Sequence, residues 1–389
     1  MNCKRPIATR LAIALSACCF PLASHGADDP ARLRAAVDGA IRPLMAQYDV
    51  PGMAVAVTID GKAFFFNYGV ASREQKTLVS ESTLFEIGSI SKTLTGTLAS
   101  YAQVLGKLAL DDHPGKFIPQ LKGKAIDKAS LLNLGTYTAG GLPLQFPDEV
   151  VNARMVDYFG QWTPDAAPGT QRRYSNPSIG LLGHISAMAM GSSFADAMEQ
   201  QLFPQLGLSH THIRMPAPAE AAYAWGYAKE NKPIRMNPGV LAFEAYGVKS
   251  TAADMIRYVQ LNIDPGSLEK PMQRAIEGTH IPYFKVGNMA QGLGWEQYAY
   301  PVTLEHLQAG NASGMLLDAN PAQKIAAPRL PSGPTWFNKS GSTAGFCAYA
   351  AFVPDRKIGI VMLANRSYPI AERIKAAHAI LTQLAHAPH

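Results

Sequence analysis

Hydrophobic residues recur at helical spacing near the start of the chain and then fill two short runs. Apolar side chains fall on one helical face between residues 31 and 48, which predicts a helix there. The runs 53–59 and 62–70 have strand character, and Asp60-Gly61 between them tolerates the positive φ angles of a tight turn. The pattern therefore predicts a β-hairpin over these two runs.

Helical spacing dominates the middle of the chain, where loops rich in proline and glycine separate the periodic segments. Helices are predicted over residues 94–105, 178–190 and 194–206. Strand character returns near the end, where the runs 346–353 and 358–365 flank a turn at 354–357. A last amphipathic helix is expected over residues 372–384.

Strands near both chain ends predict a fold of the α/β class. We expect one antiparallel sheet built from both ends and flanked by helices, with a mostly helical lobe inserted between them. In residue terms, segments 27–106 and 229–389 form a discontinuous α/β domain, and segment 107–228 forms the inserted domain. A binding cleft is expected where the two lobes meet.

The first 26 residues have the pattern of a secretory signal peptide. Three basic residues precede an apolar run over residues 11–22. Ser24 and Gly26 then supply small residues at both cleavage-recognition positions, so cleavage after Gly26 and a periplasmic location are expected. The segment Leu15-Ser16-Ala17-Cys18 leaves lipid anchoring at Cys18 as an alternative. No later stretch has the length of apolar sequence that a membrane span needs.

Composition narrows the function classes further. The net charge of +6 falls to +3 when the three basic residues of segment 1–26 are removed, and that is too weak to indicate nucleic-acid binding. Three of the four cysteines lie in the same segment, which leaves Cys347 without an internal disulfide partner. A hydrophobic fraction of 47% is ordinary for a globular enzyme with a sizeable core.

Ser89 precedes Lys92 by three residues at the expected start of a helix. Residues at this spacing share a helix face, so the ammonium can approach the hydroxyl, and the helix N-terminus favours a developing oxyanion. The spacing alone is weak evidence, because Ser267 and Lys270 repeat it. That copy lies among loop residues, with no helix face expected after it, and is interpreted as surface.

Two further triplets strengthen the case for Ser89. Tyr174-Ser175-Asn176 supplies a phenol whose pKa nearby cations could lower, and an amide that could contact substrate. Lys339-Ser340-Gly341 precedes the last strand pair, where the lysine could meet an anion and the glycine could let a substrate backbone come close. Each triplet alone is typical of a turn, but the ordered trio is uncommon.

With this trio the chain resembles the class C serine β-lactamases, within the penicillin-recognising serine enzymes, over nearly its whole mature length. Further matching stretches are 85–89 (FEIGS), 136–145 (TYTAGGLPLQ), 244–250 (EAYGVKS), 291–295 (QGLGW) and 361–366 (VMLANR). The resemblance implies Ser89 as nucleophile, Tyr174 and Lys92 as the proton-transfer pair, and backbone N–H groups of Ser89 and Ser342 as the oxyanion hole. It implies substrate contacts from Gln145, Asn176, Tyr246, Lys339, Ser340 and Gly341.

The chain departs from the family pattern at several positions. Ile370 stands where many relatives have an asparagine that contacts the substrate carboxylate, and Ala344 stands where asparagine is frequent. We therefore expect carboxylate recognition to rely on Lys339, Ser340 and Arg373, with substrate preference altered at position 370. Cys347 is interpreted as a small core side chain.

Three other functions share part of this pattern. A D-alanyl-D-alanine carboxypeptidase and a serine esterase of the same fold would share Ser89 and Lys92, but the lysine at position 339 favours the lactamase. A penicillin sensor would be acylated without turnover. His210 and His212 lack a third ligand nearby, so no metal site is expected. The expected partner is a small β-lactam, with no cofactor, no nucleic acid and a monomeric state.

Overall fold

A computed structural model describes residues 1–2 and 30–385 of the chain, so residues 3–26 of the predicted signal peptide, with the alternative lipid site at Cys18, lie outside the described residues. The described chain begins with α1 (Pro30–Gln47), whose buried face consists of Leu33, Val37, Ile41 and Leu44. These are the apolar positions whose spacing predicted the helix.

One ten-stranded antiparallel sheet forms the centre of the molecule, in the order β13-β9-β10-β11-β14-β15-β16-β1-β2-β3. The N-terminal hairpin of β1 (Gly52–Ile59) and β2 (Lys62–Ser72) joins the C-terminal hairpin of β15 (Cys347–Val353) and β16 (Ile358–Ala364). The join is the β1–β16 pair, in which Met53 lies opposite Ala364. The other strands of this sheet are β3 (Thr77–Leu78), β9 (Phe284–Val286), β10 (Met289–Gln291), β11 (Glu296–Ala299), β13 (Gln323–Lys324) and β14 (Thr335–Ser342).

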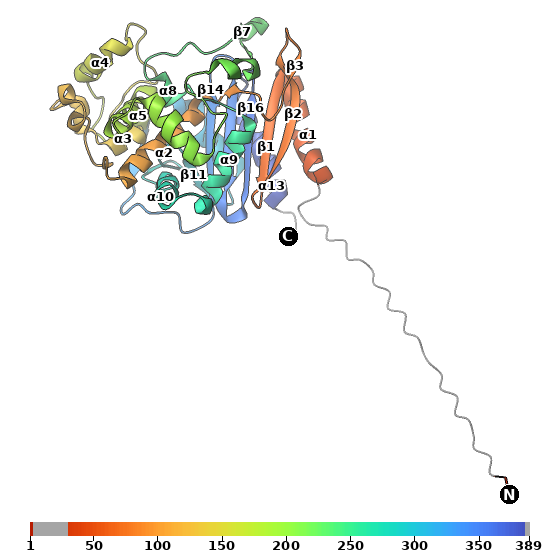
Figure 1. Ribbon diagram of the computed structural model, residues 1–389. Helices are drawn as coiled ribbons and strands as arrows, with labels where there is room; N and C mark the ends of the chain where they lie inside the picture. The colour runs from red at the N-terminus through yellow and green to blue at the C-terminus, as the bar shows by residue number, and fades with distance from the viewer. Residues whose placement is uncertain (3–29, 386–389) are drawn as a thin grey trace.

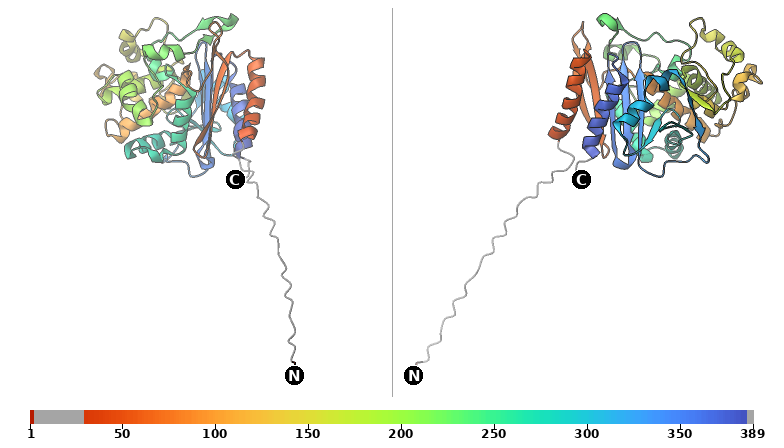
Figure 2. Two further views of the ribbon diagram at one scale, coloured as in Figure 1. Left: turned by 45° about the vertical axis from the view of Figure 1, so that its right-hand side comes forward. Right: turned by 180° about the vertical axis from the view of Figure 1, so that it is seen from behind.

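Helices cover both faces of this sheet (Figures 1 and 2). On one face lie α1 and α13 (Ile370–Ala385), and on the other lie α2 (Ser91–Val104), α9 (Ala252–Ile263) and α10 (Lys270–Thr279). Side chains of β1 alternate between two buried clusters, one on each face, so every residue of that strand is buried. The prediction of a two-terminus sheet flanked by helices is confirmed.

The final helix begins at Ile370, two residues before the predicted start, directly after Pro369. The predicted helix 194–206 is instead α6 (Phe194–Asp196), a π-helical turn (Ala197–Leu202) and α7 (Phe203–Leu206). Pro204 has no N–H to donate to the preceding turn, which favours the wider turn ahead of it.

Residues 107–228 form mainly helices and turns, among them α3 (Leu131–Gly135), α4 (Met155–Gln161) and α5 (Asn176–Ala189). Their core also includes Ala99 and Leu293 from the flanking segments. The domain boundaries at 106/107 and 228/229 stay a prediction. Short elements complete the fold: β4 (Phe85–Glu86) with β8 (Lys249–Ser250), β5 (Gln171–Arg173) with β12 (Ala319–Pro321), β6 (Gly226–Tyr227) with β7 (Pro233–Ile234), α8 (Ala242–Ala245), α11 (Leu304–Gly310) and α12 (Ser313–Leu317).

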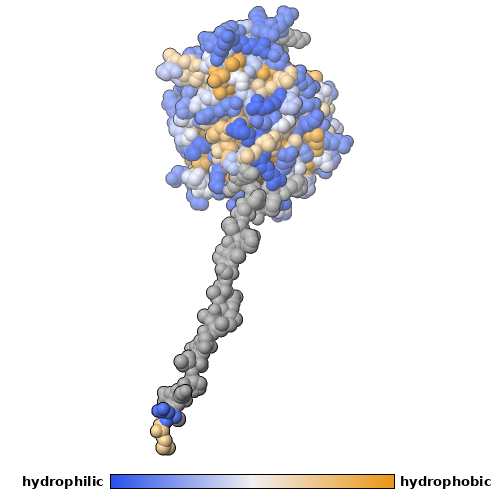
Figure 3. Space-filling model, turned by 90° about the vertical axis from the view of Figure 1, so that its right-hand side faces the viewer, coloured by the Kyte–Doolittle hydropathy of each residue, from blue (hydrophilic) through white to orange (hydrophobic). Residues whose placement is uncertain are grey.

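The outer surface is mixed in character. Figure 3 shows hydrophilic side chains over much of the face that carries α1 and β2, with smaller hydrophobic areas between them. Within residues 1–2 and 30–385, no helix combines the length and the apolar character that crossing a bilayer requires.

Candidate active site

A cavity of about 490 Å³ lies beside the end of β14, and most of the predicted site residues line it. Its walls come from the turn before α2, the start of α5, the segment after α8, and β14. The predicted residues along the cavity are Ser89, Gln145, Tyr174, Asn176, Tyr246, Lys339, Ser340, Gly341 and Ser342. The tertiary fold therefore gathers these residues from five separate parts of the chain into one cavity.

Lys92 lies directly beneath Ser89. Ser89 occupies a short 3-10 turn (Gly88–Ile90), and Lys92 is in the first turn of α2. The Lys92 ammonium, with no exposed surface, donates to Ser89 Oγ at 2.9 Å and to the carbonyl oxygen of Ala245 at 2.7 Å. Burial lowers the pKa of Lys92 to about 8, so a neutral amine is accessible near neutral pH.

Tyr174 is surrounded by three cations. The phenol follows β5, and the Ser175 side chain caps α5 directly after it. The Lys92 and Lys339 nitrogens lie 5.0 and 5.1 Å from the ring centroid, and the Arg172 guanidinium carbon lies 5.4 Å from it. Burial raises the pKa of Tyr174, but Lys339 and Lys92 outweigh that effect and lower it below the usual value for a phenol.

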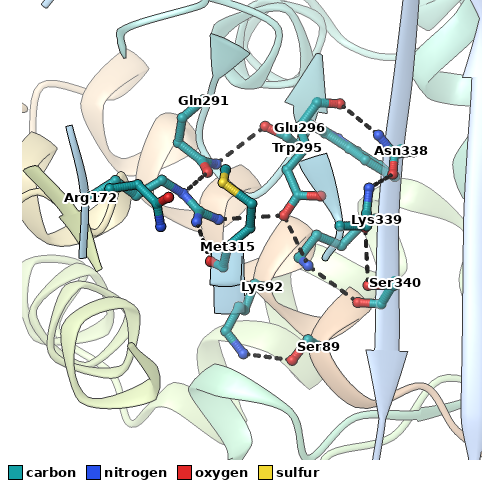
Figure 4. A network of polar contacts seen from close by, with 12 residues as sticks. Ser89, Lys92, Arg172, Gln291, Trp295, Glu296, Met315, Asn338, Lys339 and Ser340 are labelled. Carbon is teal, nitrogen blue, oxygen red and sulfur yellow. Dashed lines mark hydrogen bonds and ion pairs between the residues drawn. The ribbon is translucent and has the colours of Figure 1, made fainter. Parts of the chain in front are cut away.

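A buried ion cluster, which the sequence reasoning missed, supports Lys339 (Figure 4). Glu296 Oε1 lies 3.3 Å from Lys339 Nζ and 3.6 Å from Arg172 Nη2. Arg172 also donates to Gln291 Oε1 and to the carbonyl oxygen of Met315, both at 2.8 Å. Burial opposes the charge of Lys339, but Glu296 raises its pKa overall, so Lys339 stays cationic.

Two residues of this cluster lie next to stretches already singled out in the sequence, but nothing in the sequence indicates that they touch. Arg172 lies two residues before Tyr174, and Glu296 follows the stretch 291–295. Their meeting depends on the register of β11 against β14, in which Glu296 lies opposite Asn338. Sequence spacing does not contain that register.

The end of β14 presses against the turn that holds Ser89. Strand β11 begins at Glu296, opposite Asn338, and runs away from the end of β14, so within the described residues positions 339–342 pair with β15 alone. A Cβ added at Gly341 would overlap the carbonyl oxygen of Ile87 and lie 3.0 Å from the amide nitrogen of Ser89. A Cβ at Gly88, whose φ is +53°, would overlap the backbone of Ser342. Only glycine permits this approach, which brings the amide groups of Ser89 and Ser342 together.

Three further predicted residues, Asn176, Gln145 and Tyr246, form other parts of the cavity wall. Asn176 is almost fully buried at the start of α5, and its Oδ1 has no hydrogen-bond partner in the described part of the chain. Gln145 is exposed at the rim, and Tyr246 is half-buried directly after α8. No hydrogen bond joins Asn176 to Lys92 in the described chain, and the Asn176 side chain contributes to the cavity wall.

Arg373 does not lie where the sequence reasoning expected it. It is 2% exposed, does not line the cavity, and donates to backbone and hydroxyl oxygens of the protein. The expectation of a direct contact with a substrate carboxylate does not fit this position. Ile370, one helical turn earlier, does line the cavity.

Other residues singled out in the sequence lie elsewhere. Ser267 and Lys270 are both exposed, as expected, but Lys270 begins α10, so the expectation that no helix follows was wrong. His210 is exposed and His212 is half-buried. No group of three potential ligands for a metal ion occurs in residues 1–2 and 30–385. Cys347 is buried within β15.

Comparisons with protein-family models, with known proteins and with solved structures all find β-lactamases similar to this chain. A protein-family model described as "Beta-lactamase" matches residues 37–385. A β-lactamase of Pseudomonas fluorescens is 51% identical over 353 residues, which are 90% of this chain and 99% of that protein. Two solved structures are also similar.

The first solved structure is that of D-alanine carboxypeptidase AmpC from Burkholderia cenocepacia, with 51% identity and a TM-score of 0.87 over 91% of this chain and 99% of that one. The second is a class C β-lactamase in complex with cefoxitin, with 46% identity and a TM-score of 0.88 over 91% of this chain and 99% of that one.

Proposed function

The chain belongs to the class C branch of the β-lactamase family, and we propose that Ser89 is the nucleophile with which it hydrolyses the β-lactam amide of cephalosporins and penicillins. One observation carries the assignment: the buried Lys92 Nζ lies 2.9 Å from the Oγ of Ser89, which lines the same cavity as Tyr174. A hydroxyl with an adjacent proton acceptor is the arrangement that nucleophilic catalysis needs. Hydrolysis of this kind confers resistance to β-lactam antibiotics.

Acylation begins when Ser89 Oγ attacks the lactam carbonyl carbon and loses its proton. The acceptor is Tyr174 or Lys92, because the pKa of each is lowered and the two groups share one cluster of charges. The amide groups of Ser89 and Ser342 stabilise the oxyanion. The C–N bond then breaks, and the ring nitrogen takes a proton from the same pair.

Deacylation needs a water molecule to attack the Ser89 ester. Tyr174 takes part as the base, because Lys339 and Lys92 stabilise its phenolate. Lys339 also attracts the substrate carboxylate, together with the Ser340 hydroxyl. Gln145 and Asn176 contact the side-chain amide of the substrate, and Tyr246 forms a wall beside it.

The direct test is hydrolysis of a chromogenic cephalosporin by the mature protein, by Ser89→Ala and by Ser267→Ala. The second variant is a matched control, because Ser267 belongs to the exposed copy of the same Ser-x-x-Lys spacing. We expect Ser89→Ala to abolish turnover and the acyl adduct seen by mass spectrometry, with Ser267→Ala equal to wild type. Turnover retained in Ser89→Ala contradicts the assignment, and a stable wild-type adduct without turnover indicates a sensor or a peptidase.

Carboxypeptidase activity is a second candidate. It is the activity for which the Burkholderia cenocepacia relative is named, and the free edge of residues 339–342 could accept a peptide as an added strand. The test is release of D-alanine from a peptide that ends in D-alanyl-D-alanine, with Ser89→Ala as the blank. Absence of release at high enzyme concentration removes this candidate.

We further propose that the enzyme acts in the periplasm as a monomer, after removal of residues 1–26. The mass of the exported protein distinguishes cleavage at Gly26 from lipid attachment at Cys18. Its sedimentation measures the oligomeric state.

A further inference from the structure

Arg373 is a buried cation whose hydrogen-bond donors all have acceptors. Nε and Nη2 donate to the carbonyl oxygen of Tyr368 at 3.1 and 2.6 Å, and Nη2 also donates to Ser367 Oγ at 3.3 Å. Nη1 donates to the carbonyl oxygen of Gly341 at 2.7 Å and to Ser342 Oγ at 2.9 Å. These five bonds match the five N–H groups of a guanidinium, so none remains for a ligand.

No carboxylate balances this charge. Among the ion pairs of the described residues, none includes Arg373, although its side chain is 2% exposed. Burying a cation without a counter-ion is unfavourable unless polar groups replace its hydration. The replacing groups here include the carbonyl oxygen of Gly341 and the hydroxyl of Ser342, at the end of β14 beside the cavity.

The hydrogen bond from Arg373 to the carbonyl oxygen of Gly341 acts on the peptide group whose N–H, that of Ser342, belongs to the proposed oxyanion hole. The carbonyl of Gly341 and the N–H of Ser342 belong to one peptide unit, so a cationic donor on the oxygen makes that N–H a stronger donor. The same peptide is pressed against the turn of Ser89, where an added Cβ at either Gly88 or Gly341 would overlap backbone. Arg373 therefore contacts the carbonyl oxygen of this peptide, which points away from the Ser342 N–H of the proposed oxyanion hole.

We propose that Arg373 is a positioning residue for the oxyanion hole: its guanidinium holds and polarises the Gly341–Ser342 peptide, and it does not bind the substrate carboxylate. This inference rests on the proposed role of Ser89 and of the Ser342 N–H. It assigns to α13 a part in the chemistry, because the helix carries Arg373 in its first turn.

The test uses two boronic acids that form tetrahedral adducts on Ser89, phenylboronic acid and its 3-carboxy derivative. Both place an anionic boronate in the oxyanion hole, but only one carries a carboxylate. We expect Arg373→Gln to weaken both inhibitors by a similar factor of about 10, below the loss of about 100-fold or more when an oxyanion donor is removed outright. The acylation rate of a chromogenic cephalosporin should fall in parallel.

Two results would overturn the proposal. A loss confined to the carboxylate-bearing boronate would mean that Arg373 recognises the ligand carboxylate after all. Unchanged affinity for both boronates would mean that the guanidinium has no effect on the oxyanion hole. A failure of the proposed function would be detected separately. Either the wild-type protein would not hydrolyse the cephalosporin, or the Ser89→Ala variant would still do so.

Two further variants separate positioning from a general loss of stability. Arg257→Gln is a control for the loss of an arginine–carbonyl hydrogen bond, because the exposed Arg257 donates to the carbonyl oxygen of Leu206 outside the cavity. It should leave both boronate affinities unchanged. Arg373→Lys keeps the charge but places its donors on a single nitrogen, and should recover part of the affinity lost in Arg373→Gln. Equal losses in the lysine and glutamine variants, with both proteins folded by thermal melting, contradict polarisation by a cation.

Discussion

Tyr174, Lys92 and Lys339 lie within one cluster, in which the charge of each residue alters the proton affinity of the others. Lys339 and Lys92 lower the pKa of the phenol, whereas Glu296 raises it. Glu296 also keeps Lys339 charged, through the ion pair at 3.3 Å. The protonation of the proposed base therefore depends on residues that do not touch Ser89.

This arrangement predicts opposite pH effects for two neutral substitutions. Lys339→Gln removes a positive charge, so the pKa of Tyr174 rises and the acidic limb of the kcat/KM profile moves to higher pH. Glu296→Gln removes a negative charge, so the same limb moves to lower pH. Profiles for one cephalosporin measure both. Shifts in the same direction would show that the phenol does not govern this limb.

Ile370 offers a second test at the level of one side chain. It lines the cavity at a position where the family resemblance leads us to expect an asparagine, and isoleucine cannot donate a hydrogen bond to a carboxylate. Ile370→Asn should change the ratio of kcat/KM among penicillins, cephalosporins and carbapenems, with a gain of about 10-fold for the best-placed carboxylate. Ratios equal to those of wild type across all three classes would remove position 370 as a determinant of preference.

Among the secondary-structure elements, the contact between β14 and the turn before α2 determines the geometry of the site. The turn holds Ser89, and the strand ends at Ser342. Glycines on both sides of the contact permit the two backbones to meet. Because β14 is also paired with β15 over residues 337–342, it provides a rigid reference for the oxyanion hole.

A methyl group at Gly341 should separate these two elements. We expect Gly341→Ala to lower kcat by about 100-fold or more, because its Cβ would overlap the carbonyl oxygen of Ile87 and displace the oxyanion donors. Gly39→Ala is the control, since Gly39 is exposed in α1 with open space around it, and should raise stability by about 0.5–1 kcal/mol. Steady-state kinetics and thermal melting measure both variants. Wild-type kcat in Gly341→Ala would contradict the role of this close approach.

At the scale of the whole molecule, both chain ends meet in the middle of one sheet. Strand β16 pairs with β1 along seven residues, and Asn365 follows it directly. The Asn365 side chain accepts from the Gly52 amide at 2.7 Å and donates to the carbonyl oxygens of Val70 and Trp225 at 3.0 and 3.1 Å. One fully buried amide thus joins three segments that lie far apart in sequence.

Removal of that amide should destabilise the fold. Asn365→Ala leaves the buried Gly52 amide and its carbonyl partners without a hydrogen bond, which we expect to lower the free energy of unfolding by about 2–4 kcal/mol. Asn67→Ala is a matched control, because the side-chain amide of Asn67 donates a hydrogen bond to Glu81 that is exposed. Urea unfolding measures both. A loss below about 1 kcal/mol for Asn365→Ala would contradict this role.

The sequence by itself determined the elements and the ordered motifs. Helical spacing and alternation are local patterns, so α1, both terminal hairpins and α13 were predictable to within a few residues. The approach of Lys92 to Ser89 was predictable for the same reason, because the two residues are three positions apart. The family pattern indicated which residues from other segments belong beside them.

Only the tertiary structure decided how distant residues meet. The ion cluster of Arg172, Glu296 and Lys339 requires the register between β11 and β14, and register depends on packing across the sheet. Arg373 was expected in the cavity, but its helix directs it beneath the end of β14, where backbone and hydroxyl oxygens take all its donors. Spacing along the chain contains near-neighbour geometry, whereas long-range contacts depend on how the elements pack.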